Sequence, residues 1–137
     1  ALMPALDTNV LVRYIVHDDS AQLAAAQRLI RRCVAERLTL FVPVTVTLEL
    51  EWVLRSSFEF SKDETVRALS DLFSAAELSF ESERALEVAL DLYRRTAADF
   101  ADCVHIALAW QAGEQPILTF DRNAAKVPRA RLLSRQT

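Results

Sequence analysis

"PALDTNVLVRY" spans residues 4–14 and contains an aspartate at the junction of two apolar runs. Residues 4–6 predict a short buried strand, and Asp7 ends that strand. Apolar residues then resume at Val10. An ionised carboxylate is costly to bury, so its place at the end of a buried strand calls for a structural or a chemical reason.

The chain has 137 residues, 52% of them hydrophobic and 26% charged. This length predicts one compact domain over residues 1–137. No run of 18 apolar residues and no charged-then-apolar leader is present, so we expect a cytoplasmic protein that does not enter a membrane. Met3 is a candidate initiator, with Ala1 and Leu2 as an upstream extension. Cys33 and Cys103 lack metal-binding spacing and predict buried, reduced thiols.

The net charge of −3 argues against a protein that holds nucleic acid by bulk electrostatics. Charge is unevenly distributed, with nine acids against three bases in residues 59–91. The segment from residue 122 to the end has five bases and no acid: Arg122, Lys126, Arg129, Arg131 and Arg135. A phosphate-bearing partner would find one favourable approach there, although a solvated basic tail gives the same pattern.

Apolar residues at helical spacing follow several helix-start signals. Asp19 with Gln22, and Ser61 with Glu64, have capping-box spacing, and Ser82 precedes a third periodic run. Gly113 is the only glycine in the sequence, which excludes glycine-rich phosphate-binding loops.

Strand-sized apolar runs alternate with these predicted helices. They cover residues 39–43, 76–80, 116–120 and 130–133. Such alternation predicts an α/β fold, because each right-handed crossover lays a helix against a parallel sheet. We expect a three-layer α/β/α sandwich with a mainly parallel sheet of four or five strands. Ligands in such sheets bind outside the carboxyl ends of the strands.

Two predicted strands end in an aspartate, Asp7 in "PALD" and Asp121 in "TFDRN". In a parallel sheet both carboxylates leave at the same edge. For either residue alone, a helix N-cap or a turn is an equally good interpretation.

The segment after residue 43 contains two glutamates that a helical wheel separates. At about 100° per residue, Glu49 falls among apolar side chains, whereas Glu51 falls on the polar side with Arg55 four residues on. A carboxylate among apolar side chains needs a proton, hydrogen bonds or a cation. Glu49 is therefore a candidate site residue, and Glu51 a surface ion-pair partner. A Glu49 head that reaches water at the edge of the core is the alternative.

A further helix is predicted to begin near Asp99 in "AADFADCVHIALAW", with Asp102 on the same face of its first turn. Capping and the helix dipole are sufficient explanations for both acids. Beyond them, His105 could orient a water or a phosphate, or could be an ordinary packed side chain.

Together, these carboxylates come from four segments that can meet at one sheet edge. They would repel one another unless a cation neutralised them, and oxygen donors favour Mg²⁺ or Mn²⁺. Such ions bind substrate phosphate and activate water, a combination that hydrolyses phosphodiesters.

The motifs resemble those of PIN-domain ribonucleases, and in particular VapC-type toxins of toxin–antitoxin pairs, nearly end to end. "LDTNVLVRY" resembles the first motif of the family with its metal-binding acid at Asp7, and "VTLELEWVLR" resembles the second, with Glu49. "ADFADCVHIALA" resembles the third, with Asp102 and the additional acid Asp99. "LTFDRN" resembles the fourth, with Asp121 and the hydroxyl of Thr119.

The resemblance implies a PIN-like sheet flanked by helices, a homodimer, and RNA cleavage that depends on Mg²⁺ or Mn²⁺. It also implies a VapB-type antitoxin whose segment blocks the active groove. Asp7, Asp102 and Asp121 would hold the metal or its waters with help from Asp99, and Glu49 would bind the metal or activate a water. The third motif leaves open whether Asp99, Asp102 or both contact the metal. Thr8 and Asn9 would brace Asp7, and Arg122 would bind phosphate.

Other functions remain open. One is a catalytically silent binding module, and another is a stand-alone RNA-processing nuclease of the PIN family without an antitoxin. A haloacid-dehalogenase phosphatase fits poorly, because Asn9 stands where its second aspartate belongs. A receiver domain fits no better, because its acid pair, phosphoacceptor and late lysine are missing.

Overall fold

The computed structural model describes residues 3–134. Within them the chain divides after Glu81 into two compact units, each of which is described by itself. The proposed extension at Ala1 and Leu2, and the C-terminal base Arg135, lie outside the described residues.

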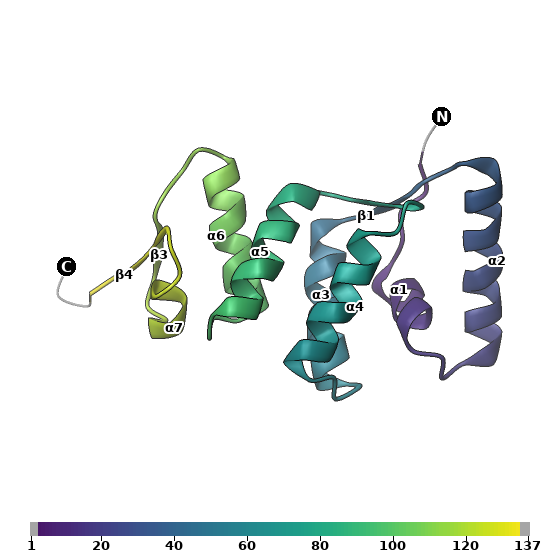
Figure 1. The fold of residues 1–137 in the computed structure, drawn as a ribbon, viewed down its shortest axis with the longest axis horizontal. Helices are drawn as coiled ribbons and strands as arrows, with labels where there is room; N and C mark the ends of the chain where they lie inside the picture. Colours follow the sequence, from purple (N-terminus) through teal and green to yellow (C-terminus); the bar gives the residue numbers. More distant parts are fainter. Residues whose placement is uncertain (1–2, 135–137) are drawn as a thin grey trace. The chain divides into compact units, whose positions relative to one another are not determined.

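Unit 1, which ends at Glu81, contains four helices and two strands among its described residues (Figure 1). In chain order they are α1 (Thr8–Ile15), α2 (Ser20–Glu36), β1 (Leu40–Val42), α3 (Val44–Ser56), α4 (Lys62–Phe73) and β2 (Leu78–Phe80).

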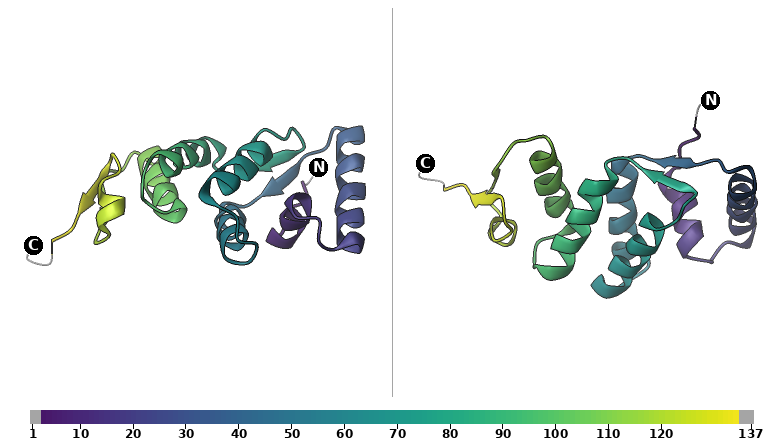
Figure 2. Two further views of the ribbon diagram at one scale, coloured as in Figure 1. Left: turned by 60° about the horizontal axis from the view of Figure 1, so that its bottom comes forward. Right: turned by 45° about the horizontal axis from the view of Figure 1, so that its top comes forward.

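The strands of unit 1 are parallel. β1 pairs with β2 in a register that joins Leu40 to Leu78, and Figure 2 shows the two strands side by side. On the other side of β1, Ala5 forms an isolated parallel bridge with Phe41. Two residues on, the same register brings Asp7 level with Pro43, so α1 and α3 start at the same edge. The strand predicted at residues 4–6 is therefore present as an extended segment.

Leucines and valines fill the core of unit 1. α1 packs on α2 and on α3, and α3 packs on α4. Leu11, Leu40, Leu50 and Leu69 are fully buried. Each such side chain contributes about 1.5–3 kcal/mol relative to an exposed one, which fixes the helices to the strands.

Unit 2 begins at Ser82 and contains three helices and two strands among its described residues. They are α5 (Glu83–Arg95), α6 (Phe100–Gln111), β3 (Ile117–Thr119), α7 (Arg122–Ala125) and β4 (Ala130–Leu132). β3 and β4 are parallel, with Thr119 opposite Leu132, and α7 lies in the connection between them. α5 packs along α6, and the rings of Tyr93 and Phe100 meet edge to face at 5.6 Å.

The α/β class and the parallel pairing are confirmed. The four described strands form two separate pairs, β1 with β2 and β3 with β4, each strand three residues long. Cys33 and Cys103 are buried, and neither forms a disulfide within the described residues, as predicted. Within residues 3–134, no helix is both long enough and apolar enough to cross a membrane.

Of the three helix starts predicted at Asp19, Ser61 and Ser82, only the one at Ser61 has the full expected geometry. Ser61 and Glu64 form the complete capping box at α4. Asp19 caps α2, but the Gln22 side chain accepts a hydrogen bond from Arg13 instead of returning to the cap. The Ser82 side chain makes no capping bond, because its backbone is left-handed with φ of 57°. The prediction at Asp19 is therefore correct for the cap but wrong for Gln22, and the prediction of a side-chain cap at Ser82 was wrong.

Candidate metal centre

Asp7 lies at the end of the extended segment 4–6 and is the N-cap of α1. Its Oδ1 accepts a hydrogen bond of 2.8 Å from the backbone N–H of Thr8. Its side chain is exposed. Among the described residues Oδ2 accepts no hydrogen bond, so the helix orients the carboxylate through one oxygen and the other has no protein donor. Capping and metal binding are therefore compatible at this residue.

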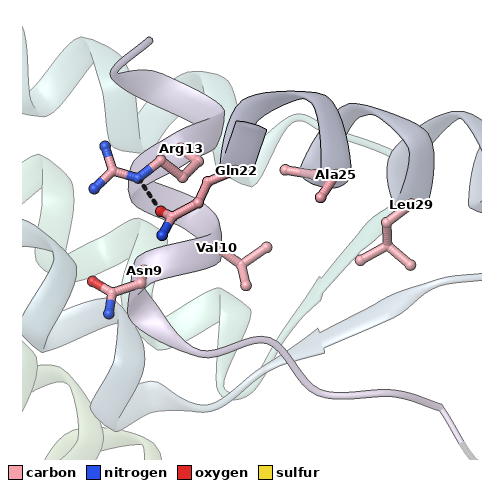
Figure 3. A pocket seen from close by; sticks show the side chains of 7 residues that line it. Asn9, Val10, Arg13, Gln22, Ala25 and Leu29 are labelled. Atoms are coloured by element: carbon pink, nitrogen blue, oxygen red, sulfur yellow. Dashed lines mark hydrogen bonds between the residues drawn. The ribbon is translucent and has the colours of Figure 1, made fainter. Parts of the chain in front are cut away.

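The expected support for Asp7 comes from one neighbour only. The backbone amide of Thr8 contacts it, whereas the Thr8 side chain is buried. Asn9 makes no hydrogen bond to Asp7 within the described part of the chain. Its side chain instead lines a hollow of about 340 Å³ between α1 and α2 (Figure 3).

That hollow is mostly apolar. Val10, Ala25 and Leu29 contribute to its wall, and at its rim the Arg13 Nε donates to the Gln22 Oε1 at 2.8 Å (Figure 3). None of the candidate acids lines it. It is therefore separate from the candidate metal centre.

The wheel assignment of the two glutamates on α3 was wrong. Glu49 is exposed, whereas Glu51 is only 3% exposed and forms an ion pair with Arg55. Arg55 carries the pair to the surface, since 38% of its side chain is accessible. The burial argument for Glu49 is thus lost, and its candidacy rests on the sequence motif.

The reason is that apolar residues surround most of α3. The wheel placed Glu49 in an arc with Val46, Leu50, Trp52 and Val53, yet of these only Leu50 is buried and Trp52 is 57% exposed. The buried face contains Leu50 and Leu54 together with Thr47 and Glu51. Packing on α1 and α4 selects that face, and the opposite face, with Glu49, is turned to solvent.

Sequence reasoning missed Glu81. Pro43, the N-cap of α3, has no side-chain acceptor, and the Glu81 Oε1 accepts from the backbone N–H of Val44 at 2.8 Å. Glu81 follows β2, and its own N–H donates to the Val42 carbonyl. Glu81 is therefore a second carboxylate, besides Asp7, at this edge of the strands of unit 1. It caps α3, the helix that carries Glu49. The signal in the sequence was a proline cap that needs an acceptor from elsewhere.

In unit 2, Asp99 and Asp121 are both N-caps. The Oδ1 of Asp99 accepts from the N–H of Asp102 at 2.8 Å at the start of α6. The Oδ1 of Asp121 accepts from the N–H of Ala124 at 2.9 Å at the start of α7. The capping interpretation is correct for both residues, and in both it fixes the direction of the carboxylate.

The pKa of Asp102 depends on its burial and on the acids near it. Its partial burial raises its pKa, and the negative charges of Asp99 and Asp121 raise it further. His105, one turn along α6, acts in the opposite direction. Asp99 and Asp121 are 22 residues apart in the sequence, so charges from two segments of unit 2 affect Asp102.

Two other predicted residues flank this group. The Oγ1 of Thr119, the last residue of β3, accepts from the N–H of Asp121 at 3.0 Å and so holds the strand-to-helix turn. Arg122, the first residue of α7, is exposed next to Asp121.

The donor chemistry fits a hard divalent cation. The acids of unit 2 supply only oxygen, and their mutual repulsion is relieved by positive charge. Within residues 3–134, no three Asp, Glu, His or Cys side chains are close enough to form a metal-binding group by themselves. Mg²⁺ commonly takes one or two carboxylates and keeps several waters, so a complete protein cage is not required.

The fold combines helices with parallel strands, and aspartates cap the helices α1, α6 and α7. Residues 5–130 match the PIN domain family, and the chain belongs to this family. PIN domains are in general metal-dependent nucleases that use Mg²⁺ or Mn²⁺, bind RNA and often bind antitoxins. A search of curated proteins gives no match.

Proposed function

We propose that this protein is an endoribonuclease that depends on Mg²⁺ or Mn²⁺. In this proposal Asp7 and Glu49 of unit 1 act together with Asp99, Asp102 and Asp121 of unit 2. The two units then form one PIN domain over residues 1–137. The family match supports a single domain, because the matched residues 5–130 include parts of both units.

The observation that carries the proposal is the match of residues 5–130 to the PIN domain family, and the acidic N-caps Asp99 and Asp121 beside Asp102 agree with it. A carboxylate partly removed from water and facing two others is poorly stabilised in its charged form. A divalent cation would remove that penalty.

Each residue has a distinct role in the proposed reaction. Asp7, Asp102 and Asp121 hold the cation or its waters, with Asp99 assisting. When bound, the cation lowers the pKa of a coordinated water and polarises the scissile phosphate. Glu49, exposed on α3, orients the attacking water or binds the cation. Arg122 binds the phosphate, and Thr119 keeps Asp121 in position.

We further propose that the protein is a VapC-type toxin, cytoplasmic and dimeric, which a VapB-type antitoxin silences. Support comes from the four motifs in order within one short chain and from the frequent pairing of PIN nucleases with antitoxins. A small neighbouring reading frame that encodes a DNA-binding protein would favour the assignment as a toxin. The absence of such a reading frame would favour a stand-alone RNA-processing nuclease.

The direct test is cleavage of a mixed RNA pool by the wild type and by Asp7→Asn, in Mg²⁺, in Mn²⁺ and in EDTA, with the cut sites mapped. We expect metal-dependent cuts by the wild type only. Equal cutting by both proteins would indicate a contaminating nuclease and remove the enzyme assignment.

A silent binding module is distinguished by metal titration followed by thermal unfolding. Mn²⁺ should raise the Tm of the wild type, because a ligand that binds only the folded state stabilises it by mass action. If acids of both units share the cation, Asp7→Asn and Asp102→Asn should each abolish the increase. An increase lost in Asp102→Asn but kept in Asp7→Asn would restrict the metal to unit 2.

A further inference from the structure

We propose that a hollow in unit 2, between α5, α6 and the turn before β4, binds single-stranded RNA by stacking a base on Trp110 and Arg129. The proposal rests on the proposed function, because it takes RNA as the substrate. We call this hollow the Trp110 groove and define it by Arg84, Glu87, Asp91, Arg95, Trp110 and Arg129. It has a volume of about 610 Å³.

A flat cationic surface forms one wall of the Trp110 groove. The guanidinium carbon of Arg129 lies 4.1 Å from the centre of the Trp110 ring, and 43% of Trp110 remains exposed. Nucleobases stack on indole rings and on guanidinium planes, whatever their sequence. A stacked Arg–Trp pair is thus a ready platform for a base.

The charges of the groove suit a phosphate chain. Asp91 accepts hydrogen bonds from Arg94 and Arg95, at 2.7 and 2.9 Å, so its charge is compensated. Arg84 and Arg129 form no ion pair with any described residue, and Glu87 is the one acid that opposes them. The groove therefore has a net positive charge in a chain whose net charge is −3. An acidic peptide would gain from the same cations but would make little use of the exposed ring.

The position of the groove predicts how it acts. Trp110 is eight residues after Asp102 on the same helix, about 12 Å along the axis at 1.5 Å per residue. A base on Trp110 would therefore lie away from the bond that is cut. The groove should strengthen the binding of RNA long enough to reach both places, and should leave the chemical step unchanged.

The test measures binding separately from cleavage. The anisotropy of a labelled RNA of about a dozen nucleotides is followed in EDTA, for the wild type, Trp110→Leu, Trp110→Phe and Arg129→Gln. We expect Trp110→Leu to weaken binding roughly 5- to 100-fold and Trp110→Phe, which keeps an aromatic face, to restore most of it. Arg84→Gln should lower the salt dependence by about 0.7 in the log–log slope, the value for one phosphate contact on a single strand.

Cleavage with Mg²⁺ supplies the second measurement. Trp110→Leu should raise KM for the long RNA with kcat unchanged, and should cut a dinucleotide, which is too short to reach Trp110, as the wild type does. Arg28→Gln, an exposed arginine on α2, is the matched control and should change neither quantity. Circular dichroism melts verify that each variant is folded.

The outcomes separate the two proposals. If the wild type cleaves RNA while Trp110→Leu and Arg129→Gln bind the long RNA with wild-type affinity, the groove proposal is overturned and the nuclease proposal stands. If the wild type neither binds nor cleaves RNA, both are overturned.

Discussion

The start of α6 and the middle of α3 carry their carboxylates in different ways. At α6 the Asp99 cap is held by a backbone N–H of its own helix, and Asp102 follows within one turn. On α3, Glu49 and Glu51 occupy opposite sides of a helix whose orientation depends on its neighbours. An acid at a helix start is thus oriented by local geometry, whereas an acid in mid-helix is oriented by packing.

The largest expected effect is the loss of RNA cleavage when Asp102, at the start of α6, is replaced. Asp102→Asn should lower RNA cleavage at least about 100-fold, beyond the 10- to 100-fold that residues supporting a ligand usually contribute. Asp19→Asn, which alters an N-cap acid of α2 outside the candidate set, should leave cleavage near the wild-type rate. Rates of a fluorogenic RNA under Mg²⁺ measure both. Equal losses in the two variants would mean that the acids of unit 2 act only through folding.

On α3, the comparison predicts a split between stability and activity. Glu51→Gln should lower the free energy of unfolding by about 1–3 kcal/mol, because it leaves Arg55 without its buried partner. Glu49→Gln should change stability by less than about 0.5 kcal/mol, as exposed positions do, while cleavage falls. Urea unfolding alongside the cleavage assay provides both numbers. A larger loss of stability in Glu49→Gln than in Glu51→Gln would mean that Glu49 lies on the buried face, as the helical wheel predicted.

At Asp99, capping and charge can be separated. Asn caps a helix as well as Asp does, whereas Ala costs about 1 kcal/mol. We therefore expect Asp99→Ala to be less stable than Asp99→Asn, and both to bind Mn²⁺ more weakly than the wild type. Asp19→Ala should lose similar stability with unchanged Mn²⁺ binding. Wild-type Mn²⁺ affinity in Asp99→Asn would assign this residue to capping alone.

The smallest effect is a pH dependence. Because the pKa of Asp102 is raised, the folded protein holds this proton more tightly than the unfolded chain does. The resulting stability is complete below the unfolded-state pKa and is lost as the pH rises through the folded-state pKa. Mn²⁺ competes with the proton, so its effect on Tm should be larger near pH 7 than near pH 4 in the wild type. A Tm increase independent of pH would exclude Asp102 as a metal-binding group.

Much of the fold was predictable because its signals are local. The strand runs ended at breakers, and β1 to β4 formed where they were expected. The acids Asp7, Asp99 and Asp121 were recognisable as possible caps, and all three are caps. Their interpretation as site residues came from the motif order, which the family match over residues 5–130 supports at the level of the family.

The capping predictions were wrong where a side chain bonds to a partner outside its own helix start, or where the backbone turns it away. Gln22 bonds to Arg13 instead of its own helix start, and the backbone at Ser82 turns the hydroxyl away from its cap position. Glu81 was overlooked because the helix that it caps begins 37 residues earlier in the sequence. No local pattern reports such contacts.

The sequence by itself determined the α/β class, the short parallel strands and the aspartates at the helix starts, because these depend on residues a few positions apart. Only the tertiary structure decided that Glu51 is buried and Glu49 exposed, and that the charge of Asp121 affects Asp102. The face a helix buries and the charges that meet across elements depend on packing between distant segments. That packing is set by the free energy of the whole unit and not by any single stretch.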